Sequence, residues 1–285
     1  MRIQIIQDII DVIRGKKEIK FVEKNVKKYN LRIPFKYRNK AFYNQKGKIF
    51  TNNYKVIDAI MAYNKNKNIP LCYENFETWF LKNIFKERYD NQLKFIKDKF
   101  LPHIKKDDIL CDMGSASGEF TFIVADYCKH IDGYDLSQKM VDYSNNYAKE
   151  NNIQNCSFYQ TDIQTSNIDK KYDNILFMGV LSCVLDDNTA IEIIKKIRNL
   201  LKSDSEGYVI YKDNCNLTKD NYYFLGPSNN YRMVARSKDK ILDMFKNNGF
   251  NIVEEVTLHE ISDNYASKNV KTVSLGLILK KTNKD

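Results

Sequence analysis

The sequence predicts an α/β fold in which a mainly parallel sheet carries helices on both faces, preceded by a mainly helical cap. From about residue 106 onward, short apolar runs of strand length alternate with longer amphipathic runs of helix length. The first of these strands leads into a loop that contains two glycines, and a helix follows directly. The second and third strands each end in an acid. Together these observations favour a ligand site at the carboxyl edge of the sheet.

The chain divides into a cap, residues 1–104, and a second domain, residues 105–285. Residues 1–27 have an apolar stripe with a period close to 3.6, which predicts a helix. Basic and apolar residues alternate after residue 31, and the turn residues at 44–47 predict a hairpin. Further helices follow before residue 104. We expect this segment to cover one catalytic domain.

Within the second domain, apolar runs define the strands in order. The expected strands are residues 109–113, 130–135, 156–162, 172–178, 207–212, 252–258 and 273–279. Helices are expected at residues 189–201 and 238–247, and Gly249 is the expected cap after the latter helix. The last two strands should form an antiparallel hairpin.

Composition places limits on the class of protein. Hydrophobic residues make up 43% of the 285 residues and charged residues 29%, which is ordinary for a globular protein. No apolar run approaches the 18 residues of a membrane span, and the first residues do not resemble a signal peptide, so we expect a cytoplasmic protein without a membrane partner. The six cysteines are dispersed and there are three histidines, so no zinc site is expected.

The formal net charge of +10 has two explanations. It follows either from a composition rich in lysine, or from a need to attract an anionic partner. The lysines are spread along the whole chain, which favours a small anionic molecule over a nucleic acid.

The order of motifs resembles that of the class I S-adenosylmethionine (SAM) dependent methyltransferases, whose sheet is Rossmann-like. The first motif of that family is acid-x-Gly-x-Gly-x-Gly, and here residues 112–118 match it except that Ala116 replaces the middle glycine. Asp135 and Asp162 follow at the ends of the second and third strands, and an apolar fourth strand comes next. The resemblance covers about residues 107–280.

The resemblance implies SAM as cofactor and S-adenosylhomocysteine (SAH) as product. Asp112 would anchor the loop or the cofactor's amino group, Asp135 would accept hydrogen bonds from the ribose hydroxyls, and Asp162 would accept the adenine amine. Asp135 has a second interpretation as a helix cap, although Ser137 is the better candidate for that role. The full set of expected cofactor-binding residues is Tyr89, Asp112, Gly114, Ser115, Ala116, Gly118, Asp135, Leu136, Met140, Asp162, Ile163 and Met178.

The fifth strand ends in Lys212-Asp213-Asn214, which is similar to two subfamilies. Metal-dependent O-methyltransferases carry Asp-Asn there as ligands, but they also need an acid after the fourth strand, where this chain has Gly179, so no metal is expected. Protein N-terminal amine methyltransferases carry Lys-Asp-Asn. Their histidine is replaced here by Cys183, and a basic peptide would be repelled by the net charge.

Asp213 is the candidate for orienting or deprotonating the acceptor, with Tyr211 and Asn214 as catalytic neighbours; a turn after the strand is the structural alternative. Arg236 would bind an anionic group or else cap the following helix region. The expected substrate-binding residues are Tyr37, Arg38, Tyr231, Arg232 and Arg236.

The sequence therefore predicts a SAM-dependent methyltransferase that acts on an oxygen or nitrogen atom of a small, anionic metabolite, of the phosphate-linked or nucleotide-linked glycan precursor type. Two alternatives remain open. One is a protein (N-terminal amine) or RNA methyltransferase, and the other is a SAM-binding protein without catalytic activity.

Overall fold

The computed structural model describes residues 86–203, 207–218, 221–225, 232–261 and 271–282. Most of the expected cap lies outside the described residues, so its helices and hairpin stay predictions. Within the described part of the chain, no helix combines the length and the apolar character needed to cross a membrane.

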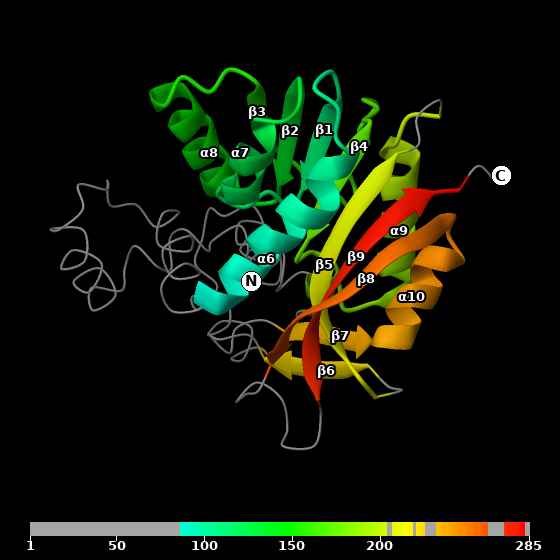
Figure 1. The fold of residues 1–285 in the computed structure, drawn as a ribbon. Coiled ribbons are helices and arrows are strands. Elements are labelled where there is room, and N and C mark those ends of the chain that lie inside the picture. Colours follow the sequence, from blue (N-terminus) through cyan, green and yellow to red (C-terminus); the bar gives the residue numbers. More distant parts are fainter. Residues whose placement is uncertain (1–85, 204–206, 219–220, 226–231, 262–270, 283–285) are drawn as a thin grey trace, which may run out of the picture.

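Five parallel strands form the centre of the sheet (Figure 1). Their spatial order is β3 (Cys156–Gln160), β2 (His130–Asp135), β1 (Ile109–Met113), β4 (Asn174–Met178) and β5 (Tyr208–Asn216). Next to β5 lies β9 (Thr272–Lys281), which runs antiparallel, and β8 (Phe250–Ile261) pairs antiparallel with β9. The predicted succession of strands along the chain and the terminal antiparallel hairpin are confirmed.

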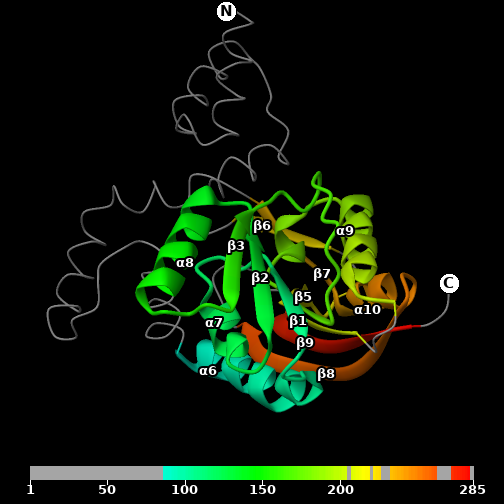
Figure 2. The same ribbon diagram turned by 90° about the horizontal axis from the view of Figure 1, so that it is seen from above.

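Helices cover both faces of this sheet, as predicted (Figures 1 and 2). One face packs against α6 (Lys86–Phe95), the π-helical turn η1 (Ile96–Phe100), the 3-10 turn η2 (Leu101–His103), α7 (Glu119–Ala125) and α8 (Gln138–Glu150). The opposite face packs against α9 (Asp187–Leu200) and α10 (Lys238–Lys246). A 3-10 turn, η3 (Leu181–Cys183), follows β4.

The side-chain alternation of each strand decides which layer a residue joins. In β5, Val209 and Tyr211 belong to the apolar core under α9 and α10, whereas Ile210 belongs to the core under α6 and α7. By the same alternation, Lys212 and Asn214 lie on the α6 face, and Asp213 lies on the α9 face. This register fixes how the end of β5 contributes to the site.

The segment between β5 and α10 differs from the prediction. No strand was expected there, but the segment contains β6 (Tyr222–Leu225) and β7 (Arg232–Ser237), which pair as an antiparallel ribbon. The end of β5 joins this ribbon through its pairing with Arg236 and Ser237. The strand signal in β6 is only four residues long, and the Gly226-Pro227 pair after it favours a loop, so sequence reasoning missed the hairpin.

Candidate functional site

The loop between β1 and α7 depends on residues in the left-handed backbone region. Gly114, Ala116 and Gly118 have φ of +89°, +46° and +78°. A Cβ on Gly114 would lie 2.4 Å from Cγ2 of Val180, and one on Gly118 would lie 2.7 Å from the ring of Phe122. The backbone therefore approaches its neighbours at distances that only glycine permits. Ala116 occupies a conformation that costs an L-residue about 1–2 kcal/mol, which explains why glycine suits this position.

Hydrogen bonds hold this loop against the end of β2. The backbone N–H groups of Gly114 and Ser115 donate to the carbonyl of Tyr134, at 2.8 and 3.0 Å. The carboxylate of Asp135 accepts from the N–H of Ala116 at 2.9 Å and from the N–H of Ser137 at 2.8 Å. Asp135 thus joins the loop, the strand end and the start of α8. A carboxylate oxygen accepts more than one hydrogen bond, so these contacts are compatible with ribose hydroxyls as additional donors.

The expectation that the Ser137 side chain caps α8 is wrong. Ser137 precedes the helix in an extended conformation, but its hydroxyl is buried and makes no hydrogen bond. Asp135, two residues earlier, satisfies the backbone at the helix start instead. The carboxylate therefore holds the backbone of the residue that precedes α8, in addition to its predicted position in the site.

Asp112 lies beneath the loop and is fully surrounded by protein. Its Oδ2 accepts a hydrogen bond of 2.5 Å from the hydroxyl of Thr121 in α7. Burial raises the pKa of Asp112 to about 7, and the nearby charge of Asp135 adds to the rise while Thr121 opposes it. Sequence analysis missed Thr121, and its position two residues after the first helical residue was the available signal. A cationic amino group bound here would favour the ionised carboxylate.

The predicted adenine-binding residues lie around the ends of β2 and β3. Asp162 is partly buried, and its carboxylate accepts from the hydroxyl of Thr165 at 3.0 Å and from the N–H of Gln164 at 3.2 Å. Met140 is buried in the first turn of α8, and Ile163 packs partly buried against the core. Leu136 lies between β2 and α8 and is partly exposed. Their contact with adenine stays a prediction.

Tyr89 joins α6 to the start of α7. Its hydroxyl donates to Oε1 of Glu119 at 2.6 Å, and its ring stacks on Phe120 with 6.0 Å between ring centroids. Glu119 directly follows Gly118, so α6 lies over the end of the glycine loop. This places Tyr89 next to the predicted cofactor site, and its contact with the cofactor is not tested. Glu119 was missed by sequence analysis.

The end of β5 separates the three residues that we expected to act in catalysis. Tyr211 is 1% exposed, and its ring packs edge-on against Phe245 of α10 at 4.8 Å between centroids, so it belongs to the core. The buried carboxylate of Asp213 accepts from the N–H of Ser182 at 2.8 Å, which holds η3 after β4. Asn214 lies on the other face, and its Oδ1 accepts from Arg88 at 3.3 Å.

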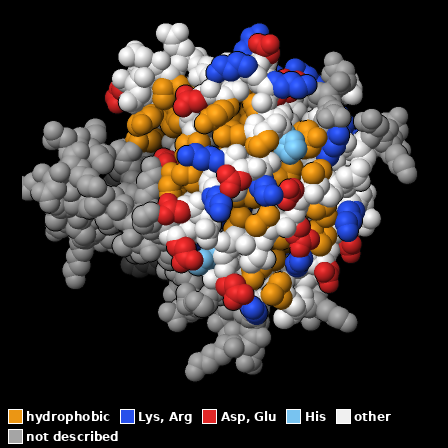
Figure 3. Space-filling model, in the orientation of Figure 1, with side chains coloured by type: hydrophobic (Ala, Val, Ile, Leu, Met, Phe, Trp, Pro, Cys, Tyr) orange, Lys and Arg blue, Asp and Glu red, His pale blue; other side chains and the backbone are white. Residues whose placement is uncertain are grey.

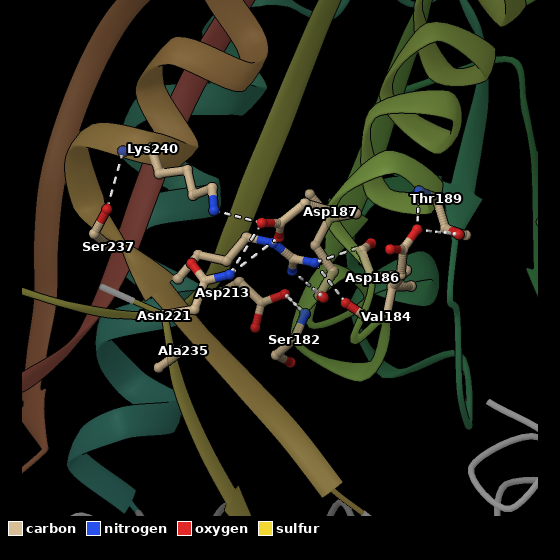
Figure 4. A network of polar contacts seen from close by, with 12 residues as sticks. Ser182, Val184, Asp186, Asp187, Thr189, Asp213, Asn221, Ala235, Ser237 and Lys240 are labelled. Carbon is tan, nitrogen blue, oxygen red and sulfur yellow. Dashed lines mark hydrogen bonds and ion pairs between the residues drawn. The ribbon is translucent and has the colours of Figure 1, made fainter. Parts of the chain in front are cut away.

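Arg236 is the centre of a buried polar network. Figure 4 shows its partners Val184, Asp186 and Asp187. Its guanidinium donates to Asp187 at 2.7 Å and to three backbone carbonyls, those of Leu181, Val184 and Asp186. Lys240 also binds Asp187. The guanidinium is therefore occupied in joining β7 to η3 and to the start of α9. This geometry favours the structural alternative for Arg236 over a contact with substrate.

Several predicted substrate residues lie outside the described part of the chain. These are Tyr37, Arg38 and Tyr231; of Arg232 the backbone is described, as the first residue of β7, but not the side chain. Met178 ends β4 and pairs in register with Lys212, whose buried side chain sequence analysis did not single out. No cluster of three potential metal-ligating side chains occurs among the described residues.

The loop fits the cofactor that the resemblance implies. The hydroxyl of Ser115 is buried in the loop without a hydrogen-bond partner, which leaves a polar atom there for a ligand. Asp112 is a buried acid that a cationic amino group would stabilise in its ionised form. We therefore expect the loop and Asp135 to hold SAM.

Comparison with known proteins gives the family. Residues 104–270, more than half of the chain, match the family described as "Methyltransferase domain". A SAM-dependent methyltransferase from Clostridium acetobutylicum covers 74% of this chain with all of its own length, at a TM-score of 0.52 and 18% identity. The N-methyltransferase NodS from Bradyrhizobium japonicum, solved with SAH, covers 71% of this chain with 91% of its own, at a TM-score of 0.50 and 13% identity.

One curated relative is similar over a shorter stretch. A 23S rRNA (uracil(1939)-C(5))-methyltransferase from Psychromonas ingrahamii is 34% identical over 79 residues, which are 27% of this chain and 18% of that protein. The chain spans less than half the length of the curated relatives that it matches. The family match, the fold and the glycine loop agree with one another. The chain belongs to the methyltransferase-domain family, and it shares its fold with solved SAM-dependent methyltransferases.

Proposed function

We propose that this methyltransferase transfers the methyl group of SAM to an oxygen or nitrogen atom of a small, anionic metabolite, such as a phosphate-linked or nucleotide-linked glycan precursor. The observation that carries the proposal is the buried amino group of Lys212. It pairs in register with Met178 at the end of β4, which is one of the expected cofactor-binding residues. The net charge of +10 supports it, since a field of that sign draws in anions.

When SAM is bound, its sulfonium supplies an activated methyl group. The residues of the chain then have to bind and align the two reactants. The glycine loop and Asp135 would fix the cofactor, and Asp213 would hold η3 beside the end of β4 through its bond to Ser182. We thus propose that Asp213 orients η3, the turn beside which the methyl acceptor would bind. If Asp213 also removes a proton from the acceptor, it would do so from this place at the end of β5.

An RNA acceptor is the second candidate, because the 79 matched residues belong to an rRNA methyltransferase. The charge distribution favours the small acceptor. On the face seen in Figure 3, lysine and arginine side chains of the described residues are interspersed with aspartate and glutamate, without one continuous basic track. An RNA backbone is usually bound by such a track.

An acceptor panel tests the proposal. Purified full-length protein is incubated with SAM and with phosphorylated sugars, nucleotides, nucleotide sugars, short basic peptides or structured RNA, and SAH release is measured for each class. We expect turnover with a phosphorylated or nucleotide-linked compound. Turnover only with basic peptides or only with RNA would contradict the proposed substrate class.

A further inference from the structure

The turn that follows β3 leads into a crossover without a helix of its own. Residues 161–173 form turns and irregular backbone between β3 and β4, and the next α-helix along the chain is α9. The crossover begins beside the predicted ribose acid, since the N–H of Thr161 donates to the carbonyl of Asp135 at 2.8 Å. A nucleoside with its ribose at Asp135 and its amino-acid tail on the loop after β1 would have its base beside this turn, because β2 lies between β1 and β3.

The internal hydrogen bonds of the turn use its N–H groups and leave its carbonyls over. The backbone N–H groups of Thr165 and Ser166 donate to the carbonyl of Asp162, at 3.0 and 2.8 Å. The carboxylate of Asp162 accepts from the N–H of Gln164. In the described part of the chain, no backbone N–H donates to the carbonyls of Ile163, Gln164 and Ser166. These carbonyls therefore need donors from outside the turn.

Lys196 of α9 supplies these donors. Its amino group lies 3.0 Å from the carbonyl oxygen of Ile163, 2.9 Å from that of Gln164 and 3.4 Å from that of Ser166. An ammonium has three N–H donors, so one partly buried side chain can satisfy all three carbonyls. Because the donor is charged, these bonds are stronger than those between neutral groups.

An apolar contact also attaches the turn, but it does not orient it. The side chain of Ile163 packs partly buried against the core on the α9 side of the sheet. Hydrophobic contact is not directional, so it sets how closely the turn approaches the core and leaves the peptide groups free to rotate. The bonds to Lys196 fix the peptide groups that directly follow Asp162. The direction of the Asp162 carboxylate therefore depends on Lys196.

We propose that Lys196 is a positioning residue for the cofactor, whose ammonium fixes the turn after β3 so that the carboxylate of Asp162 faces the amine of the adenine ring. The carboxylate has capacity for that amine beside its bonds to Gln164 and Thr165, since each oxygen accepts more than one hydrogen bond. Lys196 itself would contact no part of the cofactor. The inference rests on the predicted contact between Asp162 and adenine, and it does not depend on the identity of the acceptor.

Calorimetric titration of the full-length protein with two ligands tests this role. SAH carries the adenine amine, whereas S-inosylhomocysteine carries an oxygen in its place, to which a carboxylate cannot donate. We expect the wild type to bind SAH at least about tenfold more tightly than this analogue. Lys196→Met keeps the apolar stem and removes the donors, so it should weaken SAH binding and lower the preference to about threefold or less.

The neighbouring lysine of α9 provides the matched control. Lys195 is exposed and binds Glu192 of the same helix, so Lys195→Met removes the same charge and should keep the full preference for SAH. Lys196→Arg keeps the charge and its donors, and it should retain most of the preference. A loss in Lys196→Arg as large as that in Lys196→Met would contradict a role for the charged donors.

Two further results would overturn the proposal. An equal loss of affinity for both ligands in Lys196→Met would mean that the lysine supports the fold in general, and an unchanged preference would mean that the turn keeps its shape without it. A wild type that does not distinguish SAH from the analogue would remove the contact on which the inference rests.

A measurement on the wild type needs no variant to fold. A trace of acetic anhydride labels lysines, and mass spectrometry follows each site. Binding and the bonds of Lys196 are linked, so saturating SAH should slow the acetylation of Lys196 more than saturating S-inosylhomocysteine does, and that of Lys195 should not change. Equal protection of Lys196 by the two ligands would contradict the proposal. No methyl transfer is involved in any of these measurements, so their outcome is separate from that of the acceptor panel.

Discussion

The carboxylate of Asp135 accepts a 2.9 Å hydrogen bond from the backbone N–H of Ala116, the non-glycine residue of the loop with a φ of +46°. The acid at the end of β2 therefore stabilises the unusual backbone of the loop after β1. By resemblance, the same acid should bind the ribose of the cofactor. One side chain thus stabilises the loop and, by resemblance, is expected to contact the ligand as well.

Two glycines with similar backbone angles differ in the space around them. Gly114 has a φ of +89° and no room for a Cβ, whereas Gly179 has a φ of +76° and no neighbouring atom within 4 Å of an added Cβ. We expect Gly179→Ala to lower the free energy of unfolding by about 1 kcal/mol, from the backbone angle alone. Gly114→Ala should lower it further, because the new Cβ contacts Val180. Urea unfolding of both variants measures the difference, and equal losses would mean that the loop is less crowded than described.

The stability of the protein without cofactor should depend on the ionisation of Asp112. Its pKa of about 7 lies above the ordinary value of 3.8 for an aspartate, so the folded chain holds an extra proton between about pH 4 and pH 7. The free energy of unfolding therefore falls as the pH rises through this window. The total loss is at most about 1.4 kcal/mol for each unit by which the pKa of the folded chain exceeds that of the unfolded chain. Asp112→Asn removes this ionisation. The difference in Tm between this variant and the wild type should therefore favour the variant more at pH 8 than at pH 5.

Thermal unfolding at the two pH values checks this expectation. Asp169→Asn, which changes an exposed acid, is the control and should follow the wild-type profile. If the curves of Tm against pH for Asp112→Asn and for the wild type are parallel, Asp112 is already ionised in the folded chain.

The Arg236 network should contribute to stability and leave cofactor binding unchanged. Arg236→Met leaves three carbonyls without their donor, whereas Asp187 keeps Lys240, and a buried polar group without its hydrogen bond typically costs about 1–3 kcal/mol. Arg236→Lys should restore little of this, because one ammonium cannot reach the same set of acceptors. Urea unfolding and SAH titration measure the two effects. Normal stability combined with a raised KM for the acceptor would instead support a direct contact with substrate.

Catalysis should not need a divalent cation. The potential ligands at the end of β5 are Asp213 and Asn214, and in this structure they point to opposite faces of the strand and bind Ser182 and Arg88. A metal site requires several oxygen ligands that converge on one point. Turnover should therefore be unchanged in EDTA. A loss of activity that added Mg²⁺ restores would contradict this prediction.

The sequence predicted the order of the strands well, because the parallel strands are short, apolar and bounded by glycine and acid residues. Residues 109–113 and 130–135 form strands with the bounds that the pattern indicated. Asp135 could also be placed at a strand end, since parallel strands end at one edge of the sheet. The ribbon of β6 and β7 was missed, because β6 is short and its partner strand lies beyond the Gly226-Pro227 pair.

The roles of individual side chains were harder to predict. Periodicity places Tyr211 and Lys212 on opposite faces of β5, but it does not reveal that Tyr211 packs against Phe245 of α10. Arginine is a residue type that often binds anions, so the sequence favoured that role for Arg236. Only the folded chain brings η3 and the start of α9 close enough for their backbone carbonyls to accept hydrogen bonds from its guanidinium. Thr121 required the contact between α7 and β1 to be recognised as the partner of Asp112.

The central claim is that the loop after β1 and the acid after β2 together hold SAM, and calorimetric titration with SAH tests it most directly. Asp135→Ala removes one backbone contact of the loop, one at the start of α8 and the expected acceptor for the ribose, and charge-assisted bonds are worth about 1.5–3 kcal/mol each. The account predicts saturable SAH binding to the wild type and to the control Asp169→Ala, and affinity at least about tenfold weaker for Asp135→Ala. Equal affinity of Asp135→Ala and wild type, or no SAH binding by the wild type, would contradict it.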